Sequence, residues 1–414
     1  MQKVQVYAVQ PNGEFVLESP VPGCADNEGA SPYSSADVIS FLTRRLPRSL
    51  PVLRLLQLGP KTPGTLVITT PLPLRKPAEG REGQKDPEAV RPENVWTMLV
   101  VDRASHPATE IWSFSSLEMY HGAAPHEKEP QRASALPDTL KDQLPFSEEV
   151  LDAATAQLLG AIAHIPVTWR DTSGTKSPAE RLADIRHTPG SPYCLFGNTH
   201  STVAALLARA DSGAGDLVLD PSVPYGKYVF PVPTTNQAGE GSVLELPEGL
   251  IWSTIGPDDY ADVMAVNKII RSPSTLAKLP SAAIREAAQR PDGKPGKAVA
   301  FAFAAGDGSV RTLHVDPAYR RRGLAKAVVA RLLGMGLFAP PRNGPLAARP
   351  EVLDELLAEN GEQAGATLAF AGIEESNTGS IRTFRALGGR WLWDVYWIYL
   401  DLDRARELAG EKPS

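Results

Sequence analysis

The chain has 414 residues and a mass of 44.4 kDa, which is the length of two domains at ~100–200 residues per domain. It is 42% hydrophobic and 22% charged, the composition of an ordinary folded enzyme rather than of a disordered or membrane-spanning chain. The 38 prolines and 34 glycines predict many loops and exclude a helical bundle or coiled coil. The net charge is -6, which argues against nucleic acid and anionic lipid as partners.

The only cysteines are Cys24 and Cys194. Two cysteines cannot build a disulfide framework or a four-cysteine zinc site, so we expect a reducing compartment, the cytoplasm, with the nucleus as the alternative. The N-terminal string MQKVQVYAVQPNG alternates like a strand, and no stretch approaches ~18 apolar residues. His121 and His126 match no metal-ligand spacing. We therefore expect no membrane segment and no metal.

The first 235 residues predict a mixed α/β domain, in which short apolar runs alternate with helical patterns between proline-rich or charged stretches. The long stretches Pro71–Asn94 and Ala123–Pro145 are predicted loops. We expect strands at 52–58, 65–70, 94–102 and 227–232, and helices at 36–47, 150–162 and 200–210.

A second domain is predicted after the small, polar string TTNQAGEGS. A strand at 250–255 precedes a helix capped by Asp258, and the strand KAVAFAFAA is joined to SVRTLHV by a two-residue turn at Asp307 and Gly308. The predicted division is an N-terminal domain at 1–235, a linker at 236–248, a C-terminal domain at 249–405 and a tail at 406–414.

The string VDPAYRRRGLAKAVVARLL, at 315–333, carries the clearest chemical signal. A strand stops at Pro317, three arginines and Gly323 follow, and a helical pattern begins. Unpaired N–H groups and the positive end of the helix dipole bind phosphate at such a helix start. Gly323 has no Cβ to keep a ligand away, and the arginines add positive charge. The segment predicts a pyrophosphate site, with an exposed basic turn that only caps the helix as the alternative.

Together with LHV before it and IEESNTGSIRTFRALGG after it, this segment resembles the GNAT superfamily of N-acetyltransferases, whose coenzyme A loop reads Q/R-x-x-G-x-G/A. The resemblance covers residues 250–402 and implies a mixed, mostly antiparallel twisted sheet flanked by helices. It also implies that the loop binds the coenzyme A pyrophosphate. The loop positions that inherit this role are Arg320, Arg321, Arg322, Gly323, Leu324 and Ala325.

The same resemblance assigns further cofactor contacts. The end of the strand before the loop pairs with the pantetheine arm like an added strand, which gives that role to Leu313 and Val315. The backbone N–H near Val315 would polarise the thioester carbonyl. Asn377, in the string E-S-N-x-x-S that ends at Ser380, matches the asparagine that opens a later helix and touches the cofactor.

Within the superfamily, the strings DGSVRTLHVDPAYRRRGLA and SNTGSIRTFRALGGRWLWDVYW are most similar to the branch that contains the glycine N-acyltransferases. The N-terminal string FLTRRLPRSLPVLRLLQL is similar to the opening of that branch. This second resemblance implies that the N-terminal domain is a degenerate half of the same fold.

Acyl transfer from a thioester requires a neutral amine, and an alkyl amine of pKa ~10.4 is almost fully protonated at pH 7. The glycine N-acyltransferases and several histone acetyltransferases resemble one another in placing a carboxylate base on the strand before the loop. This chain has Ser309 there, which cannot be the base alone. His314 has a suitable pKa, but strict alternation puts it on the opposite sheet face from Ser309 unless a bulge re-aims it. Glu374 and Glu375 are the other candidates, with ordinary charge near a helix start as the alternative.

The family often places a tyrosine four residues before the glycine of its L-G-F signature, where it protonates the leaving thiolate. This chain has Phe384 at that position, which we assign to the lining of the cofactor. A thiolate whose conjugate acid has pKa ~8.5 leaves without much help, so the missing acid is tolerable.

These observations predict a metal-free N-acyltransferase with acetyl-CoA or another acyl-CoA as co-substrate. It would transfer the acyl group directly to the amine of a small molecule or amino acid. A protein or histone lysine acetyltransferase is the first alternative. A non-catalytic coenzyme A-binding protein is the second, because Ser309 and Phe384 stand where catalytic groups are often found.

Overall fold

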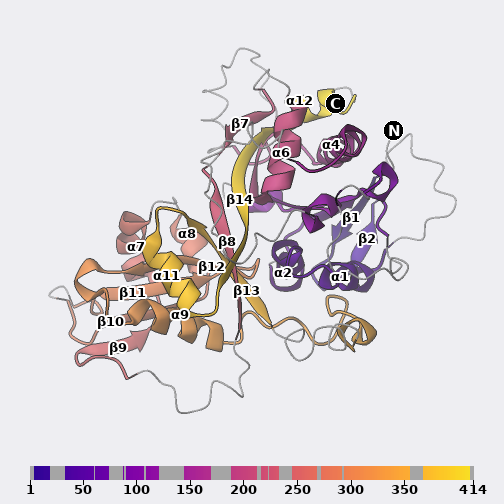
Figure 1. Ribbon diagram of the computed structural model, residues 1–414. Helices are drawn as coiled ribbons and strands as arrows, with labels where there is room; N and C mark the ends of the chain where they lie inside the picture. Colours follow the sequence, from indigo (N-terminus) through magenta and orange to yellow (C-terminus); the bar gives the residue numbers. More distant parts are fainter. Residues whose placement is uncertain are drawn as a thin grey trace.

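The computed structural model describes residues 4–18, 33–59, 61–73, 87, 90–106, 109–120, 144–168, 188–211, 216–221, 223–232, 245–267, 272–290, 293–354 and 367–410. Figure 1 shows two parts, an N-terminal one coloured indigo to magenta and a C-terminal one coloured pink to yellow, which meet along three strands, β8, β13 and β14. We refer to them as the first part and the second part.

The first part opens with a hairpin and two helices, continues with three antiparallel strands, and then alternates helix and strand. Its strands are β1 (Gln5–Val9), β2 (Phe15–Leu17), β3 (Leu66–Thr69), β4 (Thr97–Val101), β5 (Ile111–Ser115), β6 (Tyr193–His200), β7 (Val218–Pro221) and β8 (Tyr225–Pro231). Its helices are α1 (Ser35–Thr43), α2 (Leu50–Leu58), α4 (Glu148–Ala163) and α6 (Ser201–Ala210).

The second part has a similar order of elements, with one strand in place of the hairpin: a strand, two helices and three antiparallel strands are followed by helices that alternate with strands. Its strands are β9 (Leu250–Ser253), β10 (Ser281–Glu286), β11 (Ala298–Ala304), β12 (Val310–Val315), β13 (Leu368–Glu374) and β14 (Arg390–Asp401). Its helices are α7 (Tyr260–Val266), α8 (Pro273–Ala277), α9 (Leu324–Gly334), α11 (Thr378–Ala386) and α12 (Leu402–Leu408). The predicted mixed, mostly antiparallel α/β fold of two similar halves is confirmed.

The two parts exchange strands. The large sheet runs β13-β8-β14-β6-β5-β4-β3-β1-β2 with β7 beside β14, and the small one runs β12-β11-β10-β9. Strand β8 of the first part lies between β13 and β14 of the second. Strand β14 pairs with β8 over 390–395 and with β6 over 395–401. Backbone hydrogen bonds therefore cross the predicted division of the chain, and the division into domains stays a prediction.

One predicted element is wrong. The segment 52–58 is not a strand but most of helix α2, with Pro51 in its first turn. Proline favours that position because its fixed φ suits a helix and its missing N–H would have no partner there. Leu50, Leu53 and Leu56 are all buried and recur at a helical spacing, although a short apolar run fits a buried strand equally well.

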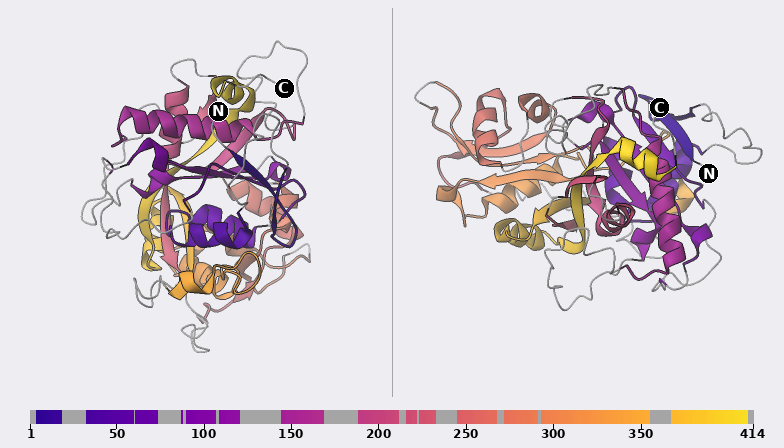
Figure 2. Two further views of the ribbon diagram at one scale, coloured as in Figure 1. Left: turned by 90° about the vertical axis from the view of Figure 1, so that its right-hand side faces the viewer. Right: turned by 90° about the horizontal axis from the view of Figure 1, so that it is seen from above.

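Helices cover both faces of each part (Figure 2). In the first part, α4 and α6 share one core with β5 and β6, and α1 and α2 share another on the opposite face. In the second part, Val328 and Leu332 of α9 enter the core on one face together with Phe384 of α11. Val263 of α7 and Leu276 of α8 enter the core on the other face. The two faces of the second part therefore present different side chains to the candidate site.

Candidate active site

Strands β12 and β13 run parallel and meet at one point. Ser309 and Phe370 form a single bridge, beside which the N–H of Phe370 donates to the carbonyl of Gly308 at 3.3 Å. Strand β12 is the edge of the small sheet and β13 is the edge of the large one, so the described strands do not pair beyond this bridge. We call this opening the strand split. Because the strands share one direction, Val315 and Glu374 end its two sides.

The predicted coenzyme A loop follows β12 directly. Asp316 caps a short turn by accepting from the N–H of Ala318 at 3.0 Å, and α9 begins after Gly323. Gly323 has φ 78°, and no side chain caps the first N–H groups of α9. A Cβ built at Gly323 would meet no atom within 4 Å. The helix start therefore offers backbone donors to an open space, as a pyrophosphate site requires.

The three predicted arginines are exposed and directly precede this helix start. The Nε of Arg320 donates to the carbonyl of Val315 at 3.1 Å, which anchors the loop to its strand. The guanidinium of Arg322 lies 5.2 Å from the ring centre of Tyr319. Arg321 has φ 63°. Left-handed residues in such a loop turn N–H groups toward one anion.

The last two predicted loop residues play different parts. Leu324 is buried in the core beneath α9, so only its backbone is available to a ligand. Ala325 is half-buried and small.

The strand before the loop presents backbone groups to the strand split. The N–H of Asp316 donates to the carbonyl of Val299 at 2.8 Å, which makes these residues a hydrogen-bonded pair. In an antiparallel ladder the next residue, Val315, then directs its N–H and carbonyl to the other edge of β12. That edge faces the split. The side chains of Leu313 and Val315 pack against the core under α9.

A bulge interrupts β12. The register passes from the pair Phe303 and Arg311 to the pair Phe301 and His314, and Thr312 between them has φ 53°. Phe301 and Phe303 both enter the core beneath α7 and α8. Because paired residues share a face, Arg311 and His314 lie on this face.

The bulge corrects one expectation. Ser309 also lies on this face, since its hydroxyl accepts from the Nε of Arg311 at 2.6 Å. Strict alternation had put His314 and Ser309 on opposite faces. That expectation is wrong, because the extra residue at Thr312 shifts the alternation of side chains along β12 by one position. His314 therefore lies on the same face as Ser309.

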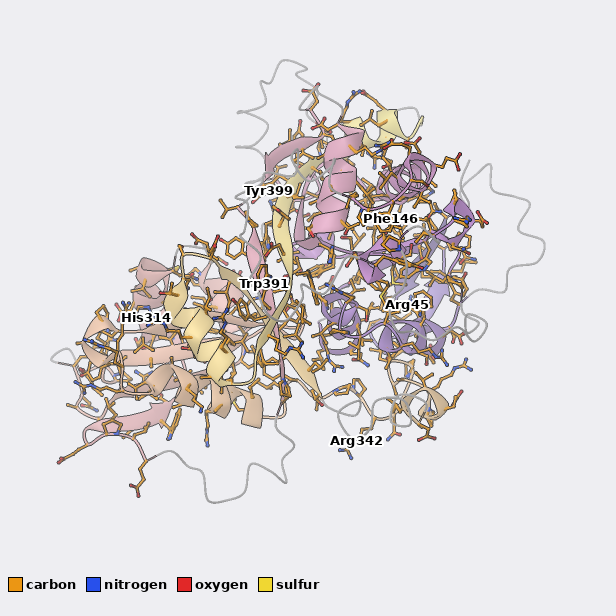
Figure 3. All side chains as sticks on the ribbon, in the orientation of Figure 1. Arg45, Phe146, His314, Arg342, Trp391 and Tyr399 are labelled. Atoms are coloured by element: carbon orange, nitrogen blue, oxygen red, sulfur yellow. The ribbon has the colours of Figure 1, made fainter. Side chains whose placement is uncertain are left out.

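His314 is half-buried and stacks on Phe301, with 5.3 Å between the ring centres and 28° between the planes. Burial and, next, the positive charge of Arg320 lower the pKa of His314, and Lys297 adds to the effect against Asp316. The imidazole is therefore neutral at pH 7 and free to accept a proton. Figure 3 shows His314 in the second part, away from Phe146 and Arg45 of the first.

A buried polar network, which no sequence motif predicts, closes the narrow end of the strand split. Asp307 is 1% exposed. Its carboxylate accepts from the hydroxyl and N–H of Ser309 at 2.5 and 3.1 Å, from Nδ2 of Asn198 at 3.1 Å, and from Nη2 of Arg311 at 2.5 Å. Burial opposes ionisation, but Arg311 and the hydrogen bonds hold the pKa of Asp307 below its usual value. The hydroxyl group of Ser309 thus donates its hydrogen bond to Asp307 and not to a substrate.

Lys227 completes this network from strand β8. It is 0% exposed, its Nζ donates to Oδ1 of Asn198 at 2.5 Å, and it lies 3.9 Å from the ring centre of Phe370. Burial lowers the pKa of Lys227 to about 7, with Asp307 raising it and Arg311 lowering it further. The network joins side chains of both parts at the point where the two sheets separate.

The predicted glutamates lie across the split from His314. Glu374 is half-buried at the end of β13, pairs with Tyr225 of β8, and accepts from the hydroxyl of Ser376 at 2.7 Å. Alternation from Phe370 puts Glu374 on the same face as Ser309 and therefore as His314. Glu375 follows the strand and is exposed.

The remaining predicted residues belong to helix α11. The Oδ1 of Asn377 accepts from the N–H of Ser380 at 3.1 Å, so Asn377 caps the helix. Asn377 is exposed and Ser380 half-buried. Phe384 is 2% exposed and packs on Phe230 with 5.1 Å between ring centres. Its ring is therefore part of the core rather than of an open surface.

Three other features bear on the chemistry. No three His, Cys, Asp or Glu side chains group to hold a metal ion in the described part of the chain. No helix among the described residues has the length and apolar character to cross a membrane. Cys194 is buried, and burial raises the pKa of its thiol, which is unsuited to an acyl-enzyme; Cys24 lies outside the described residues.

Comparison with known proteins finds one family model that matches part of the chain. Residues 26–228 match the family model described as the acyl-CoA N-acyltransferase verG N-terminal domain. No curated protein matches the chain.

Several solved structures are similar at low identity. A Drosophila protein is 16% identical over 65% of this chain and 97% of its own, with a TM-score of 0.36. A tandem GNAT protein from the clavulanic acid biosynthesis pathway is 11% identical over 88% and 93%, with a TM-score of 0.33. A GCN5-related N-acetyltransferase from Kribbella flavida is 18% identical over 54% and 76%, with a TM-score of 0.29.

The family model indicates an acyltransferase that uses an acyl-CoA. It matches the first part, whereas the predicted coenzyme A loop lies in the second. The predicted resemblance to the GNAT superfamily of N-acetyltransferases is confirmed by this match.

Proposed function

We propose that the protein transfers the acyl group of acetyl-CoA, or of another short acyl-CoA, directly to the amine of a small molecule or an amino acid. The observation that carries this proposal is the coenzyme A loop. Gly323 opens α9 in a left-handed conformation with uncapped N–H groups, directly after a strand whose free edge faces the split. We assign catalysis to the second part of the chain, in the cytoplasm or nucleus.

The cofactor would run from the loop into the strand split. Backbone donors of Gly323 and Leu324, with Arg320, Arg321 and Arg322, would hold the pyrophosphate. The pantetheine arm would lie along the edge of β12. The N–H of Val315, which the ladder directs to that edge, would donate to the thioester carbonyl and to the oxyanion that forms from it.

The amine would approach from the face that carries His314 and Glu374. His314 is our first candidate for the base, because it is neutral at pH 7 and lies one residue before Val315. Glu374 is the second and Glu375 the third. The base takes a proton from the ammonium group, and the amine nitrogen bonds to the carbonyl carbon. The carbon–sulfur bond then breaks, and the nitrogen loses its second proton to solvent to give the amide. The thiolate takes a proton from solvent, because Phe384 has no proton to give.

Free thiol release from acetyl-CoA in the presence of single amines tests this function. The panel should hold small amines, amino acids and lysine peptides, with protein lacking an acceptor as the blank. Release with small amines or amino acids supports the proposal. Thiol release with lysine peptides alone would indicate a protein acetyltransferase instead. Binding of coenzyme A without thiol release for any acceptor would indicate a non-catalytic coenzyme A-binding protein.

A further inference from the structure

The transfer steps above leave one charged side chain of the strand split without a task. The bulge at Thr312 puts Arg311 on the same face of β12 as His314, three residues nearer the closed end. Its side chain is 23% exposed, whereas its partner Asp307 is 1% exposed. A guanidinium that is held by a buried carboxylate and still reaches the surface is ordered in advance of any ligand.

The hydrogen bonds of Arg311 use one edge of its guanidinium. The Nε donates to Oγ of Ser309 at 2.6 Å and Nη2 donates to Oδ2 of Asp307 at 2.5 Å. Nη1 has no hydrogen-bond partner among the residues that the structure describes. The edge formed by Nη1 and the second hydrogen of Nη2 is therefore unused, and such an edge matches a carboxylate bidentately.

The charge of Arg311 is balanced by the buried Asp307, and Lys227 shares their network. Because burial lowers the pKa of Lys227 to about 7, this side chain is only partly protonated at neutral pH and adds a fraction of a positive charge. The network therefore carries a small excess of positive charge near pH 7, which favours an anionic ligand at the unused edge of Arg311.

The opposite side of the split is exposed at this level. Counting from the bridge at Ser309 and Phe370, the residue of β13 level with Arg311 is Gly372, which is exposed and has no side chain. A Cβ at Gly372 would lie 3.1 Å from Cη2 of Trp397, so this ring lies beside the glycine. Trp397 packs edge-on against Tyr225 with 4.9 Å between ring centres. The unused edge of Arg311 thus lies across the split from a glycine and two aromatic rings.

We propose that Arg311 binds a carboxylate of the acceptor, so that the acceptor is an amine that also carries a carboxylate, as amino acids do. This inference rests on the proposed function. The carboxylate lies at the closed end of the split on Arg311, and the amine lies toward His314 and the N–H of Val315. Asp307 and Ser309 act as positioning residues for the guanidinium.

Matched acceptor pairs test this assignment. We would measure kcat/KM by thiol release from acetyl-CoA for glycine, β-alanine and phenylalanine, each beside its carboxamide. The variants are Arg311→Gln, Arg311→Lys and the control Arg331→Gln, whose side chain lies near Trp252 on the other side of the second part. An amino acid and its carboxamide differ in the pKa of their amines. We therefore take the ratio of kcat/KM for acid and amide within each variant and compare this ratio between variants, so that the pKa difference cancels.

The wild-type protein should prefer the carboxylates, and Arg311→Gln should lower their kcat/KM at least tenfold while the carboxamides and the affinity for coenzyme A stay unchanged. Arg311→Lys should fall between the two, because lysine keeps the charge but not the paired donors. Arg331→Gln should behave as wild type. An equal loss for acids and amides, or a wild-type preference for amides, would overturn the inference.

Failure of this inference can be told from failure of the proposed function. Thiol release with carboxamides or lysine peptides alone keeps an acyltransferase and removes the role of Arg311. If no acceptor releases thiol, the proposed function fails, and calorimetric titration of phenylalanine into coenzyme A-saturated protein decides the binding role by itself. Binding that Arg311→Gln removes upholds the carboxylate site, and absence of binding to the wild type overturns it.

Discussion

The two parts of the molecule reach the same helix by different turns. In the second part, the helix after the third antiparallel strand begins at left-handed Gly323, with Arg320, Arg321 and Arg322 before it. In the first part, the corresponding helix α4 begins at Ser147, which accepts from the N–H of Val150, and has two glutamates in its first turn. Acidic residues stabilise a helix start but repel a phosphate there. One topology thus begins this helix with uncapped backbone donors in one copy and with a capped, acidic turn in the other.

The parallel pairs of the two parts differ in the same way. Strands β5 and β6 pair at Ile111 and Phe196, both 0% exposed, inside an apolar core. Strands β12 and β13 pair at Ser309 and Phe370, next to a charged network. Function in this fold therefore depends on the residues around the split and not on the split alone. The predictions below test this contrast.

The largest effect is expected from the glycine of the coenzyme A loop. Gly323→Glu adds a negative charge at the proposed pyrophosphate site, and it strains a residue at φ 78°. Coenzyme A binding should become undetectable by calorimetry. Gly336→Glu is the matched control, because Gly336 has φ 74°, and a Cβ there also meets nothing within 4 Å, but it lies beyond the other end of α9. Normal affinity in Gly323→Glu would show that the second part has no pyrophosphate site here.

The next effect concerns the bulged strand, which brings a titratable side chain to the split. If His314 is the base, His314→Ala should lower kcat on the order of 100-fold, as removal of a general base does, with unchanged affinity for coenzyme A. The wild-type acid limb of kcat should fall below pH 6.5, because burial and Arg320 lower the pKa of His314 from that value. The variant should lose this limb. A retained limb and retained kcat would pass the role to Glu374 or Glu375, for which Glu374→Gln and Glu375→Gln are the next variants.

The buried junction between the parts gives a third effect, on stability. Burial lowers the pKa of Lys227 to about 7 in the folded protein, below the ordinary 10.5 of the unfolded chain. Between these values the unfolded chain binds more protons, so stability should rise with pH, on the order of 1 kcal/mol per unit. Lys227→Met should remove this rise in urea unfolding between pH 7 and 9. Lys297→Met, a change at an exposed ion pair with Asp316, should keep it. An unchanged rise in Lys227→Met would show that Lys227 stays charged.

The sequence predicted the local structure of the loop well, a strand followed by a turn and a helix, because the features that build it are local. Pro317 ends a strand, Gly323 supplies a left-handed residue, and the helical pattern follows within a few positions. The helix-forming Leu50–Leu58 was misjudged because nine mostly apolar residues have no periodicity that separates a buried strand from a buried helix.

The buried network is not predictable in this way. Its hydrogen bonds join Asn198 to Asp307 across 109 positions and Lys227 to Asn198 across 29. Asp307 and Gly308 match a common hairpin turn. The sequence therefore gives no sign that the Asp307 carboxylate also contacts Asn198 of the first part. The insertion of β8 from the first part between β13 and β14 of the second brings these residues together, and no pattern within either part encodes that pairing. The bulge at Thr312 is equally invisible, because β-branched residues are ordinary in strands.

The smallest effect is expected where a chain segment of the second part returns to the first. The N–H of Arg349 donates to the hydroxyl of Ser40, and its guanidinium pairs with Asp37 of α1. Both side chains are partly exposed, so the ion pair should contribute less than ~1 kcal/mol. Asp37 also caps α1 with Ser34, and its replacement alone therefore overstates the pair. A double-mutant cycle of Asp37→Ala and Arg349→Ala by urea unfolding removes the capping contribution from the coupling energy. A coupling above ~2 kcal/mol, or altered coenzyme A affinity in Arg349→Ala, would mean that this segment links the first part energetically to the proposed cofactor site of the second.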